Sequence, residues 1–131
     1  MTSEVYKHRF TVPSSAIDTR NHVNNLTYLQ WCLDAAEQHW NKKASSNMKE
    51  NYVWYVLNHT IDYKASAFES EELQVDTWVT LTQGVKSERC YKIFRINDKK
   101  ILVEAKTLWC LLDAKTLKPI KIPDEFRTLF Q

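Results

Sequence analysis

The sequence contains very little glycine, proline and cysteine. Gly84 is the only glycine among 131 residues, and there are three prolines and three cysteines. With so little glycine and proline, the turns must be made mainly from Asn, Asp and Ser. The odd number of cysteines (Cys32, Cys90 and Cys110) and the lack of a CxxC pair argue against a disulfide framework and a metal site. We expect reduced, buried thiols.

The sequence also lacks a long hydrophobic run and a strong charge of one sign. No apolar stretch approaches the ~18 residues that a membrane-spanning helix needs. The first ten residues, MTSEVYKHRF, carry charge where a secretory signal peptide is apolar. The formal charge of +2 is too small to indicate nucleic acid as a main partner. The sequence therefore predicts a cytoplasmic protein with no membrane and no nucleic-acid partner.

Large apolar side chains are plentiful. The chain is 44% hydrophobic and contains five Trp, six Tyr and five Phe, which is enough to form a core and argues against disorder. There are no repeats and no linker-like stretches. Residues 1–131 are therefore predicted to form a single domain.

Two hydrophobic periods divide the chain. Residues 5–12 alternate as a strand does, and residues 26–41 follow a helical period, with an apolar stripe of Leu26, Leu29, Leu33, Ala36 and Trp40. Four further strands are predicted, at residues 52–65, 73–81, 88–97 and 101–112, with hairpin turns at Gly84 and at residues 97–99. This order predicts an α+β fold in which an antiparallel sheet wraps around one long helix.

A cluster of polar side chains lies directly before the predicted helix. A helix N-terminus offers free amides to a developing oxyanion, and a carboxylate near an imidazole can act as base or nucleophile. Turn formation and helix capping are the alternative explanation for such a cluster. Its members are Asp18, Arg20, Asn21, His22, Asn24 and Asn25.

Residues 18–31, DTRNHVNNLTYLQW, resemble the D-x-x-x-H-V-N-N-x-x-Y-x-x-W motif of the 4-hydroxybenzoyl-CoA thioesterase-like family. The stretch is also similar to one in acyl-ACP thioesterases. The resemblance implies a hot-dog fold whose subunits join sheets edge to edge, with sites at their interface and an apolar acyl tunnel beside the helix. By position it implies a catalytic carboxylate at Asp18, a histidine at His22 and a polar helper at Asn24. Asn25, Tyr28 and His59 are predicted to bind substrate; for His59 a structural role in its strand is the alternative.

The sequence departs from the family's pattern at several positions. Asn21 stands where many relatives have glycine, and Arg20 where the acyl-ACP enzymes have asparagine. Those enzymes carry a Glu-Cys pair in a second segment, whereas this chain has Ser66 and Ala67 there. A second catalytic carboxylate is thus missing from its expected place, and neither nearby glutamate (Glu69 or Glu71) is assigned to that role.

Several other residues allow two interpretations. Lys64, Lys86 and Arg89 stand where hot-dog enzymes meet CoA phosphates, but solvated cations are the alternative. Residues 52–55 line an acyl tunnel or fill the sheet–helix interface. Cys32 is expected to be packed, and His8 and His39 are expected at the surface or an interface.

The sequence therefore predicts a thioesterase that hydrolyses an acyl-CoA or acyl-ACP substrate through Asp18, without metal or cofactor, as a homodimer or a tetramer of dimers. Two alternatives stay open. One is a hot-dog hydratase or dehydratase acting on acyl thioesters, and the other is a non-catalytic acyl-thioester binding protein. The identity and length of the acyl chain are not predicted.

Overall fold

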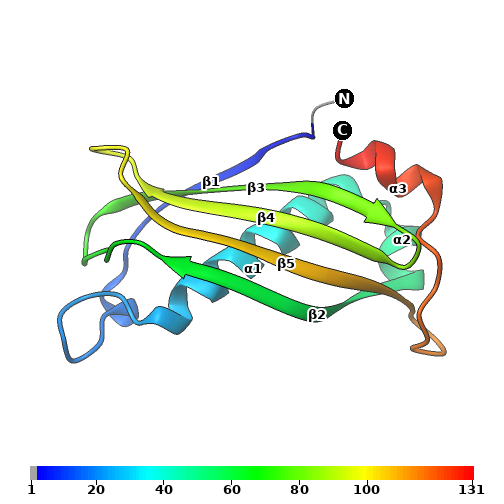
Figure 1. Cartoon of the computed structure of the whole chain (residues 1–131), viewed down its shortest axis with the longest axis horizontal. Helices are drawn as coiled ribbons and strands as arrows, with labels where there is room; N and C mark the ends of the chain where they lie inside the picture. The colour runs from blue at the N-terminus through cyan, green and yellow to red at the C-terminus, as the bar shows by residue number, and fades with distance from the viewer. Residues whose placement is uncertain (1–2) are drawn as a thin grey trace.

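The computed structural model describes residues 3–131 and consists of one five-stranded antiparallel sheet and one long helix (Figure 1). The sheet order is β1-β3-β4-β5-β2, so β1 and β2 are its edges. This arrangement confirms the predicted α+β architecture. The elements in chain order are β1 (Tyr6–Thr11), a 3-10 turn (Ser14–Ala16), α1 (Asn25–Lys43), α2 (Ser46–Asn51), β2 (Tyr52–Tyr63), β3 (Glu72–Gln83), β4 (Lys86–Arg95), β5 (Ile101–Asp113) and α3 (Asp124–Leu129).

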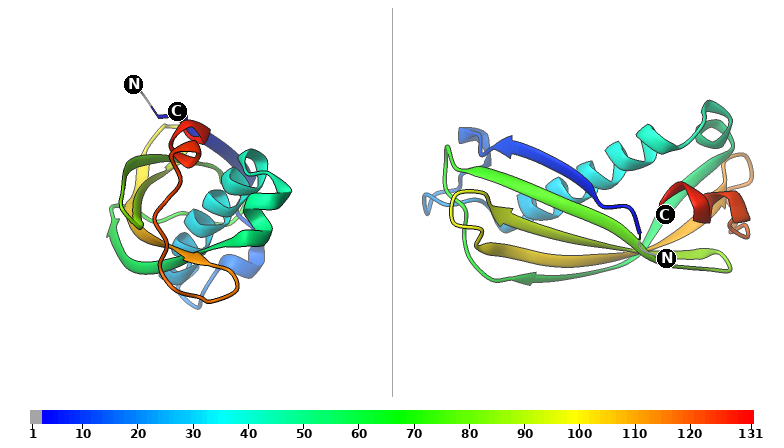
Figure 2. Two further views of the ribbon diagram at one scale, coloured as in Figure 1. Left: turned by 90° about the vertical axis from the view of Figure 1, so that its right-hand side faces the viewer. Right: turned by 90° about the horizontal axis from the view of Figure 1, so that it is seen from above.

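The sheet curls around α1, as the end-on view in Figure 2 shows. The strands β3, β4 and β5 follow one another as antiparallel hairpins, in agreement with the sequence prediction. Gly84 makes the first turn with φ +63°, a left-handed conformation that glycine adopts without strain. β2 reaches the far edge of the sheet, beside β5, because the short helix α2 returns the chain after α1.

The face of α1 that meets the sheet differs from the predicted stripe. Its buried residues are Tyr28, Cys32, Ala35, Ala36 and His39, whereas Leu26 is 76% exposed. The concave sheet brings β1 and β3 close to the helix, so small side chains form the contact and the larger leucines lie beside it. The packed thiol of Cys32 is confirmed, and burial raises its pKa to about 12.

Two residues that were expected at the surface are buried. His39 has no exposure and Arg89 is 5% exposed, so the predictions of a surface histidine and of a solvated or phosphate-binding arginine are wrong. Both side chains lie between α1 and the sheet, His39 on the buried face of α1 and Arg89 on the buried face of β4. Lys64 and Lys86 are exposed, as expected, and Lys64 pairs with Glu104 at 3.4 Å.

The short helices α2 and α3 were not predicted. Phe126 of α3 packs with Leu111 and Ile122 in a second core cluster that closes the end of the molecule near the end of α1 (Figure 2). The Glu4 amide donates to the Phe130 carbonyl at 2.8 Å, which ties the two ends of the described chain together. None of the helices within residues 3–131 has the length and apolar character needed to cross a bilayer.

Candidate active site

The loop before α1 is a tight, backbone-bonded turn. Ile17 and Val23 form an isolated antiparallel bridge, and within it the Asp18 amide donates to the His22 carbonyl at 3.0 Å. Asn21 closes the turn with φ +65°, a left-handed conformation that Asn tolerates better than most residues. This conformation explains how the loop turns without a glycine. The turn places Asp18 and His22 next to each other.

Asp18 and His22 are neighbours but not a hydrogen-bonded pair. Asp18 Oδ1 lies 3.9 Å from His22 Nδ1, which is too long for a hydrogen bond. Asp18 Oδ1 instead accepts from the Arg20 amide at 2.8 Å, as in an Asx turn. Both side chains are about one-third exposed, at 28% and 32%. The carboxylate thus shapes the turn through one oxygen and makes no hydrogen bond through Oδ2 within residues 3–131.

Asn24 is the N-cap of α1. Its side-chain oxygen accepts from the Leu26 amide at 2.8 Å, and its own amide donates to the Ala16 carbonyl at 3.1 Å. The amides of Asn24 and Leu26 are therefore occupied. Among the three residues at the helix start, Asn25 has an amide without a hydrogen bond inside the described chain. This amide is the one best placed to stabilise an oxyanion at the helix N-terminus.

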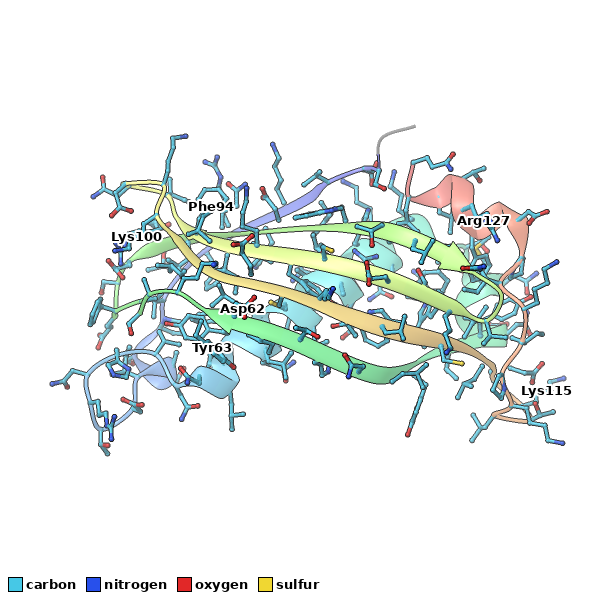
Figure 3. The ribbon with its side chains drawn as sticks, in the orientation of Figure 1. Asp62, Tyr63, Phe94, Lys100, Lys115 and Arg127 are labelled. Carbon is cyan, nitrogen blue, oxygen red and sulfur yellow. The ribbon has the colours of Figure 1, made fainter. Side chains whose placement is uncertain are left out.

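The hydroxyl groups of Tyr28 and Tyr63 form hydrogen bonds with backbone groups around this loop. The Tyr28 hydroxyl accepts from the Ala67 amide at 2.7 Å, and the Ala67 carbonyl accepts from the Val23 amide at 3.0 Å. Burial raises the pKa of Tyr28. Tyr63, at the end of β2, donates to the Asn25 carbonyl at 3.2 Å and lies near the start of α1 (Figure 3). A substrate contact by Tyr28 or Asn25 stays a prediction.

The segment that lacks the second carboxylate has another charged group nearby. Glu71 pairs with Arg95 Nε at 2.7 Å and accepts from the Phe68 amide at 2.7 Å. Arg95 also donates to the Ser66 carbonyl at 3.1 Å. Glu71 is therefore engaged in holding the loop between β2 and β3. Glu69 is exposed.

His59 lies well away from this loop. It is four residues before Tyr63 on β2, a separation of roughly 13 Å along a strand. Its Nδ1 is 2.8 Å from Thr107 Oγ1, and burial lowers its pKa. Within one copy of the chain, His59 and Asp18 are therefore not brought together.

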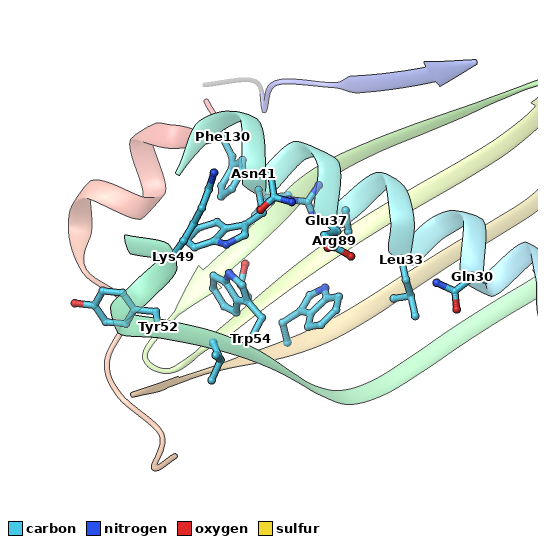
Figure 4. Close-up of a pocket in the computed structure, with 15 residues that line it drawn as sticks. Gln30, Leu33, Glu37, Asn41, Lys49, Tyr52, Trp54, Arg89 and Phe130 are labelled. Carbon is cyan, nitrogen blue, oxygen red and sulfur yellow. The ribbon is translucent and has the colours of Figure 1, made fainter. Parts of the chain in front are cut away.

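A cavity of about 550 Å³ lies between α1 and the sheet, on the side of the C-terminal half of the helix (Figure 4). Its size is that of a small-molecule site. Three tryptophans (Trp40, Trp54 and Trp109) form much of its wall, and Leu33 of α1 also lines it. The full lining is Gln30, Leu33, Ala36, Glu37, Trp40, Asn41, Lys49, Tyr52, Val53, Trp54, Val79, Ser87, Arg89, Trp109 and Phe130.

The family resemblance implied an apolar tunnel beside the helix, but most of the residues that line this cavity could not be named from the sequence, because they come from six elements and the C-terminus. Tyr52 and Trp54 line the cavity and also pack against Phe126, so they fill the space between sheet and helix, and their contact with an acyl chain stays a prediction. Alternation along β4 puts Arg89 on the same face as Ser87 and Tyr91, but it does not tell which face of the strand is buried. Ser87, Arg89 and Tyr91 all face inward at every second position.

Comparison with known proteins identifies the family that this chain matches. The family model for the acyl-ACP thioesterase N-terminal domain matches residues 3–130. A chloroplastic acyl-acyl-carrier-protein hydrolase, FATB2, of Cuphea viscosissima is 24% identical over 132 residues, which cover 94% of this chain and 32% of that protein. The chain thus spans about a third of the curated relatives that it matches over most of its length.

Two solved structures share the fold. A 1,4-dihydroxy-2-naphthoyl-CoA thioesterase from Synechocystis superposes with a TM-score of 0.84 at 19% identity, covering 95% of this chain and 94% of that one. A 12:0-ACP thioesterase from Umbellularia californica gives a TM-score of 0.83 at 17% identity, covering 97% of this chain and 51% of that one. The hot-dog fold is therefore confirmed.

Proposed function

The chain belongs to the family of acyl-ACP thioesterase N-terminal domains, and we propose that it hydrolyses an acyl-CoA or acyl-ACP thioester to a free acid and a thiol. The observation that carries the proposal is the position of Asp18. Its carboxylate has one uncommitted oxygen and stands in the turn that leads into α1, where the Asn25 amide at the helix start is unbonded. We place the reaction in the cytoplasm and in lipid metabolism; the FATB2 hydrolase of Cuphea viscosissima is chloroplastic.

In this proposal Asp18 Oδ2 supplies the base or the nucleophile. As a base it takes a proton from water, whose hydroxyl adds to the acyl carbon while the thiolate leaves and is protonated. As a nucleophile it adds to the acyl carbon and displaces the thiolate, which takes up a proton. Water then cleaves the resulting mixed anhydride to the free acid and restores the Asp18 carboxylate. In either route the Asn25 amide and the helix N-terminus stabilise the negative charge on the carbonyl oxygen. His22 orients the thioester or the water from the edge of the same turn.

We further propose that two copies join their sheets through β2, which is a free edge in the described chain (Figure 1). Several large apolar side chains of this strand are exposed, which favours a covered edge. They are Val53 at 39%, Tyr55 at 58%, Leu57 at 45% and Tyr63 at 45% exposure.

A two-fold axis between the paired β2 strands would make them antiparallel. The Tyr63 end of one copy would then lie beside the Tyr52 end of the other. Tyr63 is bonded to Asn25 at the start of α1, whereas Tyr52 lines the cavity. The Asp18 loop of one copy would therefore lie at the mouth of the other copy's cavity. Each site would then combine the carboxylate of one copy with the cavity of the other.

The substitution Asp18→Asn tests the hydrolysis proposal. The amide oxygen can still accept from the Arg20 amide, so the turn is kept while the charged oxygen is lost. We expect kcat/KM to fall by about 10²–10⁴-fold on a panel of acyl-CoA and acyl-ACP substrates, measured by thiol release. Asp124→Asn, which changes a 92%-exposed side chain on α3, is the matched control and should leave turnover unchanged. Unchanged turnover in Asp18→Asn would refute the assignment.

A non-catalytic binding protein is the second candidate. It is favoured by the ion pair that commits Glu71 to Arg95 and by the absence of a carboxylate at Ser66 and Ala67. Such a protein would bind a non-hydrolysable thioether analogue but release no thiol from any substrate. A hydratase would modify the acyl chain, also without thiol release, and mass analysis of the product separates these two outcomes.

A further inference from the structure

Arg89 is a buried cation in the floor of an aromatic cavity. Its side chain is 5% exposed, lines the cavity from β4, and lies 5.2 Å from the centre of the Phe130 ring. It donates to His39 Nδ1 at 2.9 Å and to Thr77 Oγ1 at 3.1 Å. Both bonds leave from Nη1, although a guanidinium has five N–H groups. Most of its donors are thus uncommitted within residues 3–131.

The charge of Arg89 is not balanced by a neighbouring carboxylate. No Asp or Glu of the described chain lies within 4.0 Å of its nitrogens. Glu4 is connected to it only through His39, whose Nε2 lies 2.7 Å from Glu4 Oε1, and Lys43 pairs with the same carboxylate at 2.6 Å. Burial lowers the pKa of His39, so this ring is neutral at pH 7. The cluster of Glu4, Lys43, His39 and Arg89 therefore carries one excess positive charge.

A buried cation without a counter-ion is costly, and Arg89 stays charged. Burial lowers its pKa to about 10, which still leaves the guanidinium protonated at pH 7. Removing a cation from water is strongly unfavourable unless an anion or hydrogen bonds compensate it. The one carboxylate in the cavity wall is that of Glu37 on α1, which is exposed and forms no ion pair with Arg89 within residues 3–131. An anion delivered by a ligand would complete the site.

We propose that Arg89 binds an anionic oxygen carried by the acyl group itself, so that this chain prefers thioesters of acids with a second carboxylate at the far end. The inference rests on the proposed thioester hydrolysis and names its substrate class. The planar guanidinium fork matches a carboxylate in bidentate geometry. Ser87, two residues away on the same inward face of β4, places a hydroxyl in the same wall. The three tryptophans contact the methylene chain.

Matched pairs of acyl-CoA substrates test this preference in the unmodified protein. Adipoyl-CoA is compared with hexanoyl-CoA, and suberoyl-CoA with octanoyl-CoA, so that each pair differs only at the end of the chain. We expect the terminal carboxylate to raise kcat/KM at least about tenfold, because a site built to bind a polar group discriminates strongly against an analogue that lacks it. Equal rates, or faster turnover of the methyl-ended partner, would overturn the inference.

The substitution Arg89→Met then assigns the preference to this residue. We expect the ratio of kcat/KM between the two members of each pair to fall to about one or below. Lys86→Met changes an exposed cation on the same strand, outside the cavity, and should keep the ratio of the unmodified protein. A ratio that is the same in both variants would show that Arg89 does not read the terminal group.

Binding measurements separate this inference from the hydrolysis proposal. Thioether analogues of the same pairs cannot be cleaved, so their Kd values in the unmodified protein report recognition alone, even if Arg89→Met does not fold. Tighter binding of the carboxylate-ended analogue without thiol release would support the recognition by Arg89 and refute hydrolysis. Hydrolysis of both thioesters, together with equal Kd values for the two analogues, would support the hydrolysis proposal and refute recognition by Arg89.

Discussion

At the scale of single residues, His39 links Arg89 to Glu4 through hydrogen bonds at its two ring nitrogens. It has no solvent exposure, stacks on Tyr6 at 5.2 Å between ring centres, and meets the Phe130 ring edge-on at 4.8 Å. Desolvation is the largest influence on its pKa and lowers it, although Glu4 opposes this effect. The neutral ring can accept from Arg89 at Nδ1 while it donates to Glu4 at Nε2. A protonated ring would lose its acceptor and face the guanidinium as a second cation.

Stability should therefore fall when the solution is acidified. The pKa of His39 is lower in the folded protein than in the unfolded chain, where it is near 6.5, so the unfolded chain binds the extra proton first. Its contribution is complete above pH 6.5 and is lost as the pH falls below that value. We expect a lower urea midpoint at pH 5.5 than at pH 7.5, and a smaller difference in His39→Gln.

Two other histidines supply the controls for this measurement. The pKa of His59 is also lowered by burial, so His59→Gln should remove a separate part of the pH dependence. His8 lies on the edge strand β1 and is only partly buried, and His8→Gln should reproduce the unmodified protein. If His39→Gln showed the full pH dependence, the neutral buried ring would not be the cause.

At the scale of elements, α1 begins at Asn24, the residue for which the family resemblance implies a role as polar helper in catalysis. The Asn24 side chain is committed to the Leu26 amide, which explains its presence without any contact to substrate. Asn24→Ala should lower the free energy of unfolding by about 1 kcal/mol, because the first turn loses its capping acceptor. Asn24→Asp retains an acceptor and should stay within a few tenths of a kcal/mol of the original protein. Urea denaturation at pH 7.5 checks both values.

The same two variants separate capping from chemistry. If Asn24 acts only as a cap, Asn24→Asp keeps its thiol-release activity as well as its stability. A variant that is fully stable but at least about tenfold slower would show that the amide group takes part in the reaction. The turn residue Asn21 is not a suitable control here, since its left-handed backbone would itself be disturbed.

The elements themselves were largely predictable from the sequence, but the direction of their side chains was less so. Alternation and turn residues located every strand, and period 3.6 located α1. The wrong helix face arose because large leucines dominate a periodicity count, whereas the curved sheet admits Cys32, Ala35 and Ala36. In β4, polar residues occupy both faces, so alternation alone could not show that Arg89 points inward. α2 and α3 are six residues each, too short for a periodic pattern.

At the scale of the whole molecule, the candidate site is divided between distant places. The Asp18 loop lies at the start of α1, and the cavity extends toward the other end of the helix, between Gln30 and Asn41 on that element. The motif in the sequence identified the loop because its residues are contiguous. The cavity could not be found that way, since chain folding alone brings Trp40, Trp54 and Trp109 together.

A subunit-complementation experiment tests whether two copies share one site. Asp18→Asn removes the carboxylate, and Leu33→Trp fills the cavity with a bulkier side chain. If each site combines one copy's loop with the other's cavity, a mixed dimer has one intact site. Random association of equal amounts makes half of the dimers mixed, so co-refolded variants should recover about a quarter of the unmodified activity, although each alone has almost none.

A second mixture places both changes in the same copy. It combines equal amounts of the double variant Asp18→Asn/Leu33→Trp and the unmodified chain. With shared sites, both sites of a mixed dimer are defective, and activity per total dimer falls to about a quarter. With sites contained in one copy, each mixed dimer keeps one good site and about half of the activity persists. No recovery in the first mixture together with half activity in the second would exclude the shared site. Light scattering on each mixture establishes that dimers are present, because a monomer would give no recovery for a different reason.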